Sequence, residues 1–67
     1  MAVTKIIELV GAGSSSDEAV KAALSDARQS LRNIKALDVV SVGLRGENLD
    51  EWRAHVRISF LVERVSE

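Results

Sequence analysis

Apolar residues dominate the first segment of the chain, Val3–Val10, which is rich in β-branched and aliphatic side chains. Such residues favour strands, and here they occupy both faces rather than every second position. The pattern therefore predicts a strand whose two faces both meet other groups. Residues 11–16, with the sequence Gly-Ala-Gly-Ser-Ser-Ser, break the apolar pattern and predict a flexible turn into the next element.

A helix is predicted directly after this turn. Ser15 stands three residues before Glu18, which is the spacing of a capping box, and the acidic pair Asp17 and Glu18 suits the positive end of a helix dipole. The apolar residues that follow recur at intervals of three and four, which predicts one apolar stripe on a helix ending near residues 32–33. This stripe consists of Val20, Leu24, Ala27, Leu31 and Ile34.

The second half of the chain predicts two further strands joined by a polar turn. Leu37–Leu44 is apolar on both faces, and residues 45–50 contain the turn-forming residues Gly46 and Asn48. The segment after the turn alternates between apolar and polar residues, which is typical of a strand with one buried face. Its predicted core face consists of Trp52, Ala54, Val56, Ile58, Phe60 and Val62.

The element order is therefore β-α-β-β, which indicates an α+β fold with a three-stranded antiparallel sheet packed on one helix. The last two strands are expected to form an antiparallel hairpin. A single helix covers one face of such a sheet and little more, so the remaining apolar groups on the first two strands need cover from other subunits. Trp52, as a large aromatic residue on the inward face, is expected to be a core or interface anchor.

Composition strengthens the prediction of an oligomer. The chain has 67 residues, which is one small domain (1–67), and it contains no cysteine and a single histidine. Small domains bury a smaller fraction of their surface and usually add disulfides, a metal or oligomerisation to become stable. The absence of cysteine excludes disulfides and thiolate metal sites, and one histidine does not build a His-rich metal site, so oligomerisation remains.

Charge and hydropathy exclude some classes of binding partner. The net charge of −1 argues against a general attraction to nucleic acid or an anionic membrane. No apolar run approaches the roughly 20 residues that span a bilayer, and the first residues do not fit a secretory signal. We therefore expect a cytoplasmic protein that binds neither nucleic acid nor membrane.

Catalytic chemistry has little support in the sequence. Ser41, Ser59 and His55 are present, but their spacing does not indicate a nucleophile–base arrangement, and there is no Gly-x-Ser-x-Gly elbow. We therefore expect that the protein is not an enzyme. The carboxylates near the polar turn are of the type that calcium prefers, but the usual calcium-loop pattern is absent, so a solvated turn is favoured. They are Glu47, Asp50 and Glu51.

Cationic side chains alternate along the polar face of the last predicted strand: Arg53, His55 and Arg57. Two interpretations of this stripe remain open. The cations pair with acidic residues across the sheet or between subunits, or they form an anion site that is repeated around a symmetry axis of the oligomer. The acidic candidates for pairing are Glu8, Asp38 and Glu63.

Several segments spread over nearly the whole chain resemble the dodecin family. They are residues 5–11 (Lys-Ile-Ile-Glu-Leu-Val-Gly), 18–20 (Glu-Ala-Val), 31–34 (Leu-Arg-Asn-Ile) and 51–52 (Glu-Trp), with Phe60. The resemblance implies a hollow shell of twelve copies, a homododecamer. It also implies non-enzymatic storage or quenching of flavins, which many dodecins bind as stacked pairs in pockets between subunits.

The resemblance also marks departures from the family pattern. A flavin-stacking tryptophan is expected where this chain has Ala36, and a flavin-binding glutamine where it has Arg53. Arginines expected on the second and third strands are replaced by Gly43 and Leu61. The resemblance thus implies an altered pocket lined by Lys35, Ala36 and Arg53 from neighbouring subunits.

Three hypotheses about the ligand follow. In the first, the shell stores a small anionic or nucleotide-like molecule in the altered pocket. In the second, the pocket holds a flavin (FMN, FAD or riboflavin) in a modified way. In the third, the shell is structural or binds a cation such as calcium and takes no organic ligand.

Overall fold

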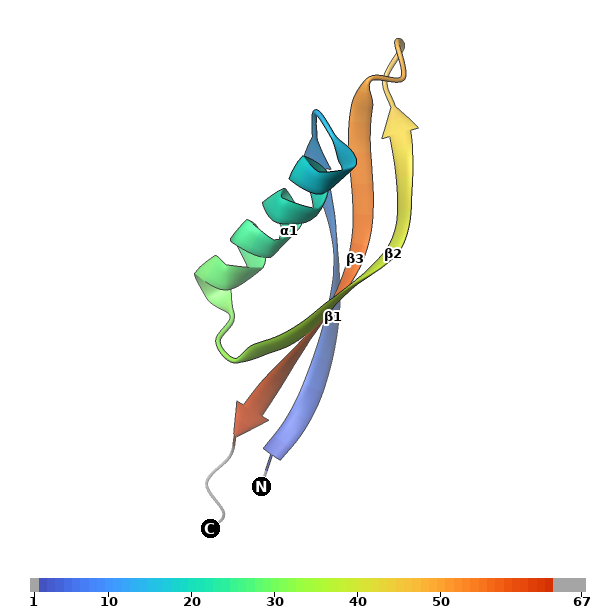
Figure 1. Cartoon of the computed structure of the whole chain (residues 1–67). Helices are drawn as coiled ribbons and strands as arrows, with labels where there is room; N and C mark the ends of the chain where they lie inside the picture. The colour runs from blue at the N-terminus through green and yellow to red at the C-terminus, as the bar shows by residue number, and fades with distance from the viewer. Residues whose placement is uncertain (1, 64–67) are drawn as a thin grey trace.

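The chain folds as strand, helix, strand, strand in the computed structural model, which describes residues 2–63 (Figure 1). The elements are β1 (Ala2–Gly13), α1 (Ser16–Ser30), β2 (Ile34–Arg45) and β3 (Glu51–Glu63). This confirms the predicted β-α-β-β order and α+β class. Each strand is longer than its apolar pattern indicated, because the pairing continues through the polar and glycine-containing residues at the strand ends.

The sheet is antiparallel throughout and has the spatial order β1-β3-β2. The predicted hairpin of the last two strands is confirmed, with its turn at residues 46–49. β3 therefore pairs on both sides, whereas β1 and β2 form the two edges. The register of β2 against β3 shifts between Ile34 and Ala36 and again between Val39 and Ser41. Each shift adds a residue to β2 and changes which later residues share a face with β3.

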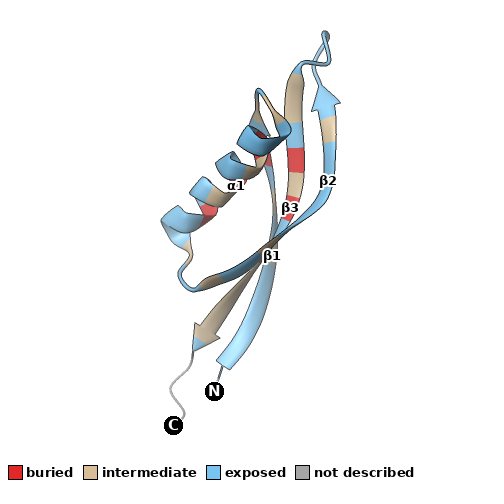
Figure 2. Cartoon of the chain, in the orientation of Figure 1, coloured by how far each residue is buried: buried red, intermediate tan, exposed pale blue. Residues whose placement is uncertain are grey.

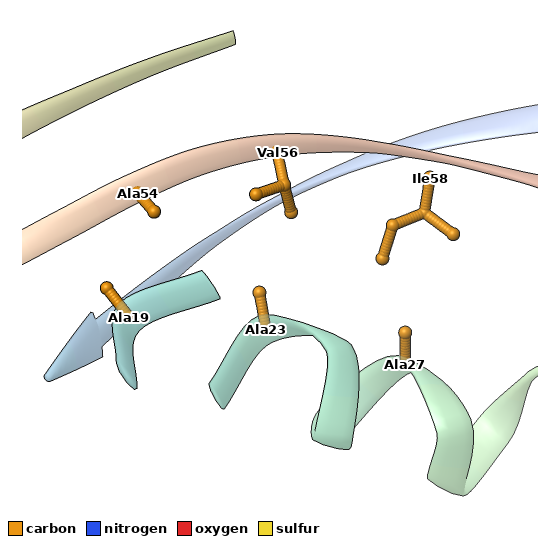
Figure 3. Packing of buried hydrophobic residues seen from close by; sticks show 6 residues of the cluster. All are labelled: Ala19, Ala23, Ala27, Ala54, Val56 and Ile58. Atoms are coloured by element: carbon orange, nitrogen blue, oxygen red, sulfur yellow. The ribbon is translucent and has the colours of Figure 1, made fainter. Parts of the chain in front are cut away.

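α1 lies against one face of the sheet, which we call the core face (Figures 1 and 2). The core consists of alanines from the helix packed against Ala54, Val56 and Ile58 from β3 (Figure 3). Its fully or almost fully buried members are Ala19, Ala23, Ala27, Ala54, Val56 and Ile58. The inward alternation predicted for β3 is thereby confirmed at its centre.

The predicted helix stripe is confirmed at Ala27, which is buried, but Ala19 and Ala23 complete the buried face of the helix, and the helix ends earlier than predicted. Val20 and Leu24 are only half-buried and lie beside the buried alanines, because the helix is too close to the sheet for larger side chains between them. The helix ends at Ser30, and the backbone N–H of Leu31 donates to the Ala27 carbonyl as its C-cap. Asn33 then takes a positive φ of 60°, which turns the chain so that Ile34 begins β2.

The predicted flexible turn at residues 11–16 is wrong for its first half, because β1 continues to Gly13. Gly11 pairs with Ala54 of β3 and is buried beneath the helix. A Cβ atom at this position would lie only 2.1 Å from the carbonyl oxygen of Ala19. The glycine is therefore needed for the close approach of α1 to β1.

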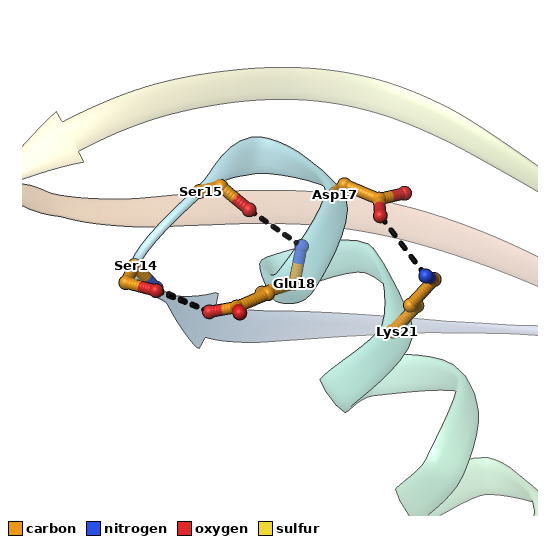
Figure 4. Close-up of polar contacts among 5 residues, drawn as sticks. All are labelled: Ser14, Ser15, Asp17, Glu18 and Lys21. Carbon is orange, nitrogen blue, oxygen red and sulfur yellow. Dashed lines mark hydrogen bonds and ion pairs between the residues drawn. The ribbon is translucent and has the colours of Figure 1, made fainter.

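The start of α1 has the predicted cap with one difference (Figure 4). The backbone N–H of Glu18 donates to the Ser15 hydroxyl oxygen over 3.1 Å, as in a capping box. In that motif the Glu18 carboxylate returns to the N–H of the cap residue. Here it accepts instead from the backbone N–H of Ser14, over 3.2 Å, and from the Ser14 hydroxyl. These hydrogen bonds to the charged form, first the hydroxyl and then the N–H, lower the pKa of Glu18.

Replacing Ser15 by alanine is expected to lower the free energy of unfolding by about 1 kcal/mol, because the Glu18 N–H loses its acceptor. Chemical denaturation at one fixed protein concentration measures the change. Ser25→Ala is the matched control, since Ser25 is an exposed residue within the same helix. Equal stability of the two variants would contradict a role for the Ser15 hydroxyl as the cap.

Candidate functional site

The face of the sheet opposite the helix, which we call the open face, carries the cationic stripe of β3. Because Ala54, Val56 and Ile58 point to the helix, the alternating residues Arg53 and His55 project to the other side. In register with them are Ala12 and Gly43 beside Arg53, and Val10 and Ser41 beside His55. Exposed residues from all three strands thus surround the predicted stripe.

The stripe pairs with acidic residues, which confirms part of the first interpretation. Glu8 of β1 lies 2.5 Å from Nε2 of His55 and 3.9 Å from a guanidinium nitrogen of Arg57. Arg53 is held from its own strand instead, since its Nε donates to Glu51 over 2.6 Å. All of these side chains are partly exposed, so the ion pairs orient them more than they stabilise the fold.

A hollow of about 420 Å³ lies on the open face near the β2–β3 hairpin. Its polar lining is cationic and hydroxylic: Arg45, Arg53, His55 and Ser41. Val10, Val42 and Gly43 complete the lining. We call this feature the Arg45 hollow. No carboxylate is among its lining residues in the described part of the chain, so its walls are suited to an anion.

Local hydrogen bonds hold the two arginines of the hollow. Arg45 Nη1 donates to the carbonyl oxygen of Leu44 over 2.9 Å, and the same nitrogen lies where it would be 2.9 Å from a Cβ atom at position 43. The guanidinium of Arg45 therefore folds back over Gly43, the residue paired with Arg53. Glycine at position 43 leaves the space that the Arg45 guanidinium group occupies.

The three predicted site residues do not come together within one chain. Lys35 and Ala36 are exposed at the start of β2, where Ala36 lies opposite Ser59, whereas Arg53 lies opposite Gly43. At about 3.3 Å per residue, the stretch of β3 between positions 53 and 59 spans roughly 20 Å. A pocket with all three residues therefore needs more than one subunit, as the resemblance implied.

Sequence reasoning missed Arg45 and Ser41 as partners of Arg53. The sequence placed Arg45 in the polar turn. In the structure Arg45 is instead the last residue of β2, where the hairpin register pairs it with Glu51. Ser41 faces His55 because of the register shift after Val39, and such a shift has no clear signal in the alternation of β2.

Both aromatic residues of the chain, Trp52 and Phe60, belong to the core face of β3. They are half-buried, and Trp52 packs against the buried cluster, as predicted. Position 36 is an exposed alanine. By the alternation of β3, no tryptophan, phenylalanine or tyrosine ring lies on the open face, since the chain contains one tryptophan, one phenylalanine and no tyrosine.

A metal site requires a cluster of metal-ligating side chains, and a membrane-spanning helix requires a long apolar segment. Within residues 2–63, no group of three or more histidine, cysteine, aspartate or glutamate side chains is placed to hold a metal ion. The predicted carboxylate group of Glu47, Asp50 and Glu51 is included in this finding. No helix in the same range is long and apolar enough to cross a bilayer.

Exposed apolar side chains remain on the edge strands β1 and β2, where the sequence predicted a need for cover, and in the turn between β2 and β3. Val10 and Leu49 are each 61% exposed, and Ile6 is 57% exposed. On β2, which the helix barely covers, the large exposed residues are Val39, Val40, Val42 and Leu44. The structure is thus a small β-α-β-β protein whose exposed apolar surface is of the kind that neighbouring subunits cover in an assembly.

Comparison with known proteins agrees with this class. The family model described as Dodecin matches residues 3–63. A protein from Thermus thermophilus of known crystal structure is 31% identical, with a TM-score of 0.85, and the match covers 97% of this chain and all of that one. A variant of the T. thermophilus dodecin is 31% identical with a TM-score of 0.84, over 96% of this chain and all of the other.

Dodecin from Streptomyces coelicolor is 25% identical, with a TM-score of 0.86 over 96% of each chain. No curated protein matches the chain. The chain belongs to the dodecin family. Dodecins are non-enzymatic, flavin-binding dodecameric proteins, and the fold implies an oligomeric shell.

Proposed function

We propose that this dodecin forms a homododecameric shell that stores a small anionic ligand and lacks the stacked flavin site of its family. The observation that carries the proposal is the exposed Ala36, together with the absence of a tryptophan, phenylalanine or tyrosine ring on the open face. The exposed apolar residues of β1 and β2 support the assembly, because neighbouring subunits are the natural cover for them.

The residues present do not fit a flavin held by stacking. Ala36 offers a methyl group where the family resemblance implies an indole ring, and Trp52 and Phe60 point to the core face instead. Stacking of a base on an aromatic side chain is worth about 1–3 kcal/mol in nucleic-acid complexes. Its loss weakens binding about tenfold to a hundredfold.

The cations near this pocket favour an anion instead. Lys35 is exposed beside Ala36, and Arg53 is 45% exposed on the open face. Contributed by neighbouring subunits, an ammonium and a guanidinium group suit a carboxylate or a phosphate. Storage without turnover agrees with the absence of a nucleophile–base arrangement in the sequence.

Replacing Ala36 by tryptophan is expected to strengthen riboflavin binding about tenfold to a hundredfold, because it supplies a stacking surface. Titration of the purified assembly, followed by quenching of flavin fluorescence, measures the affinity. The unaltered protein should give no quenching at micromolar riboflavin.

Ala22→Trp is the matched control, since Ala22 is an exposed alanine on α1. This variant should bind riboflavin no better than the unaltered protein. Strong quenching by the unaltered protein would instead support a flavin-binding dodecin with a modified pocket. Light scattering on the same samples tests the shell, and a stable monomer would contradict it.

A further inference from the structure

We infer that the Arg45 hollow binds a phosphoryl group, so that the stored anion is a phosphomonoester held by Arg45, Arg53 and Ser41. This inference rests on the proposed function in one respect, because Arg53 belongs to both sites. Its other residues are new: neither Arg45 nor Ser41 belongs to the pocket of Lys35, Ala36 and Arg53. The hollow is also complete within one chain, whereas that pocket needs a second subunit.

Two arginine side chains line the same hollow. Arg45 and Arg53 come from the adjacent antiparallel strands β2 and β3, and both are among its lining residues. Two cationic groups that line one hollow repel each other, and the ion pair of Arg53 with Glu51 offsets only part of this repulsion. An anion between the two guanidinium groups would neutralise the remainder.

Both arginines keep N–H donors that no protein acceptor uses in the described contacts. A guanidinium group has five N–H donors in a planar fork. Glu51 accepts from Nε of Arg53, and the Leu44 carbonyl accepts from Nη1 of Arg45. Each contact uses one nitrogen of its guanidinium group, a terminal one in Arg45 and Nε in Arg53, and leaves further N–H groups for a ligand. Arginine forks of this kind bind phosphate oxygens with two parallel hydrogen bonds.

The arrangement of donors around the hollow favours a phosphate over a carboxylate. A carboxylate has two oxygens in one plane, which a single arginine fork satisfies. Here two forks approach from different strands, and the Ser41 hydroxyl adds a donor from a third position. A tetrahedral phosphoryl group offers three free oxygens in different directions, together with a charge near −2 at neutral pH. It therefore matches this donor set better than a planar anion of charge −1.

The size and lining of the hollow also suit an organic group attached to the phosphate. The hollow, at about 420 Å³, has room for more than a phosphate ion, and Val10, the β1 partner of His55, lines it beside the polar groups. His55 is tied to Glu8 through Nε2, so its ring is held at the edge of the hollow. A small organic group attached through one ester oxygen fits this mixed lining.

The test uses the full chain in its assembled form, with glycerol 3-phosphate and inorganic phosphate as probes and acetate as the planar comparison. Calorimetric titration should show binding of both phosphates and weaker binding of acetate. Arg45→Gln is expected to weaken phosphate binding about tenfold to a hundredfold, because it removes charge-assisted hydrogen bonds. Arg28→Gln is the matched control, since Arg28 is an exposed arginine on α1, and it should leave the affinity unchanged.

Gly43→Ala provides a second variant that keeps every charge. Its Cβ atom would meet only the end of the Arg45 side chain and would displace that guanidinium group, so phosphate binding should weaken. Equal phosphate affinity in Arg45→Gln and Arg28→Gln would overturn the inference.

The two proposals fail differently. An anion whose binding is lost in Lys35→Gln and retained in Arg45→Gln would overturn the phosphoryl site and support the proposed storage pocket. If the assembly binds none of the probes and no other small anion, both proposals are wrong.

Discussion

Replacing Gly11 by alanine is expected to lower the free energy of unfolding by about 3 kcal/mol or more, because the added methyl group has no space. Its Cβ atom would lie 2.1 Å from the Ala19 carbonyl oxygen and 2.8 Å from the backbone nitrogen of Ala23. Both are backbone atoms of α1, so the whole helix would have to move away from the sheet. Urea denaturation at one fixed protein concentration measures the loss.

The chain offers a matched control in the same sheet. Gly43→Ala makes the same chemical change on β2, where the Cβ atom would be 2.9 Å from the mobile end of the Arg45 side chain. That side chain can move at small cost, so the stability should change by less than about 1 kcal/mol. If Gly11→Ala were as stable as Gly43→Ala, the close approach of α1 to β1 would not be a requirement of the fold.

Replacing Ile58 by alanine is expected to cost about 2–5 kcal/mol, since it removes the bulk of a fully buried side chain. Ile58 and Val56 are the largest fully buried side chains of the described structure. The helix residues opposite these side chains are Ala19, Ala23 and Ala27, whose methyl groups are too short to fill a new cavity (Figure 3). A large part of the transfer and cavity cost should therefore remain.

Thermal and urea denaturation of the assembled protein measure this effect. Ile6→Ala is the control, because Ile6 is an isoleucine of the same sheet that is 57% exposed in the protomer. Ile58→Val, which should cost about 0.5–1.5 kcal/mol, keeps the test usable if the alanine variant does not assemble. An Ile58→Ala variant that is no less stable than Ile6→Ala would contradict the assignment of the core.

The order of elements and the core face of β3 could be predicted because each rests on local chemistry. Strict alternation from Trp52 onward identifies the buried face, since successive side chains of a strand point to opposite sides. The serine cap likewise depends on residues within one turn of one another. The spacing of Ser15 and Glu18 predicted the hydrogen bond from the Glu18 N–H to the Ser15 hydroxyl, although it is Ser14 that donates to the Glu18 carboxylate.

The helix face was predicted less well, because alanine carries an ambiguous signal. Large apolar residues at helical spacing predicted a stripe through Val20 and Leu24, yet Ala19 and Ala23 are the residues against the sheet. The distance between the helix and the sheet decides which size fits, and glycine at position 11 permits the short distance. Neither quantity follows from the periodicity of the helix alone.

The candidate site was predicted only in part for a related reason. Arg53 and His55 could be placed on one polar face from the alternation of a single strand. Their neighbours Arg45 and Ser41 depend on the pairing of β2 with β3, which includes register shifts. A shift of one residue moves a side chain to the opposite face, so the composition of the Arg45 hollow depends on contacts between strands.

Local residue patterns in the chain thus define the strands, the helix and the cationic stripe of β3, because these depend on residue propensity and alternation. The need for other subunits also follows from the sequence, because so short a chain buries too little apolar surface by itself. The strand order β1-β3-β2, the alanine core and the Arg45 hollow depend on which segments approach each other and how closely. These distances result from packing and register between segments far apart in the sequence, and only the folded chain sets them.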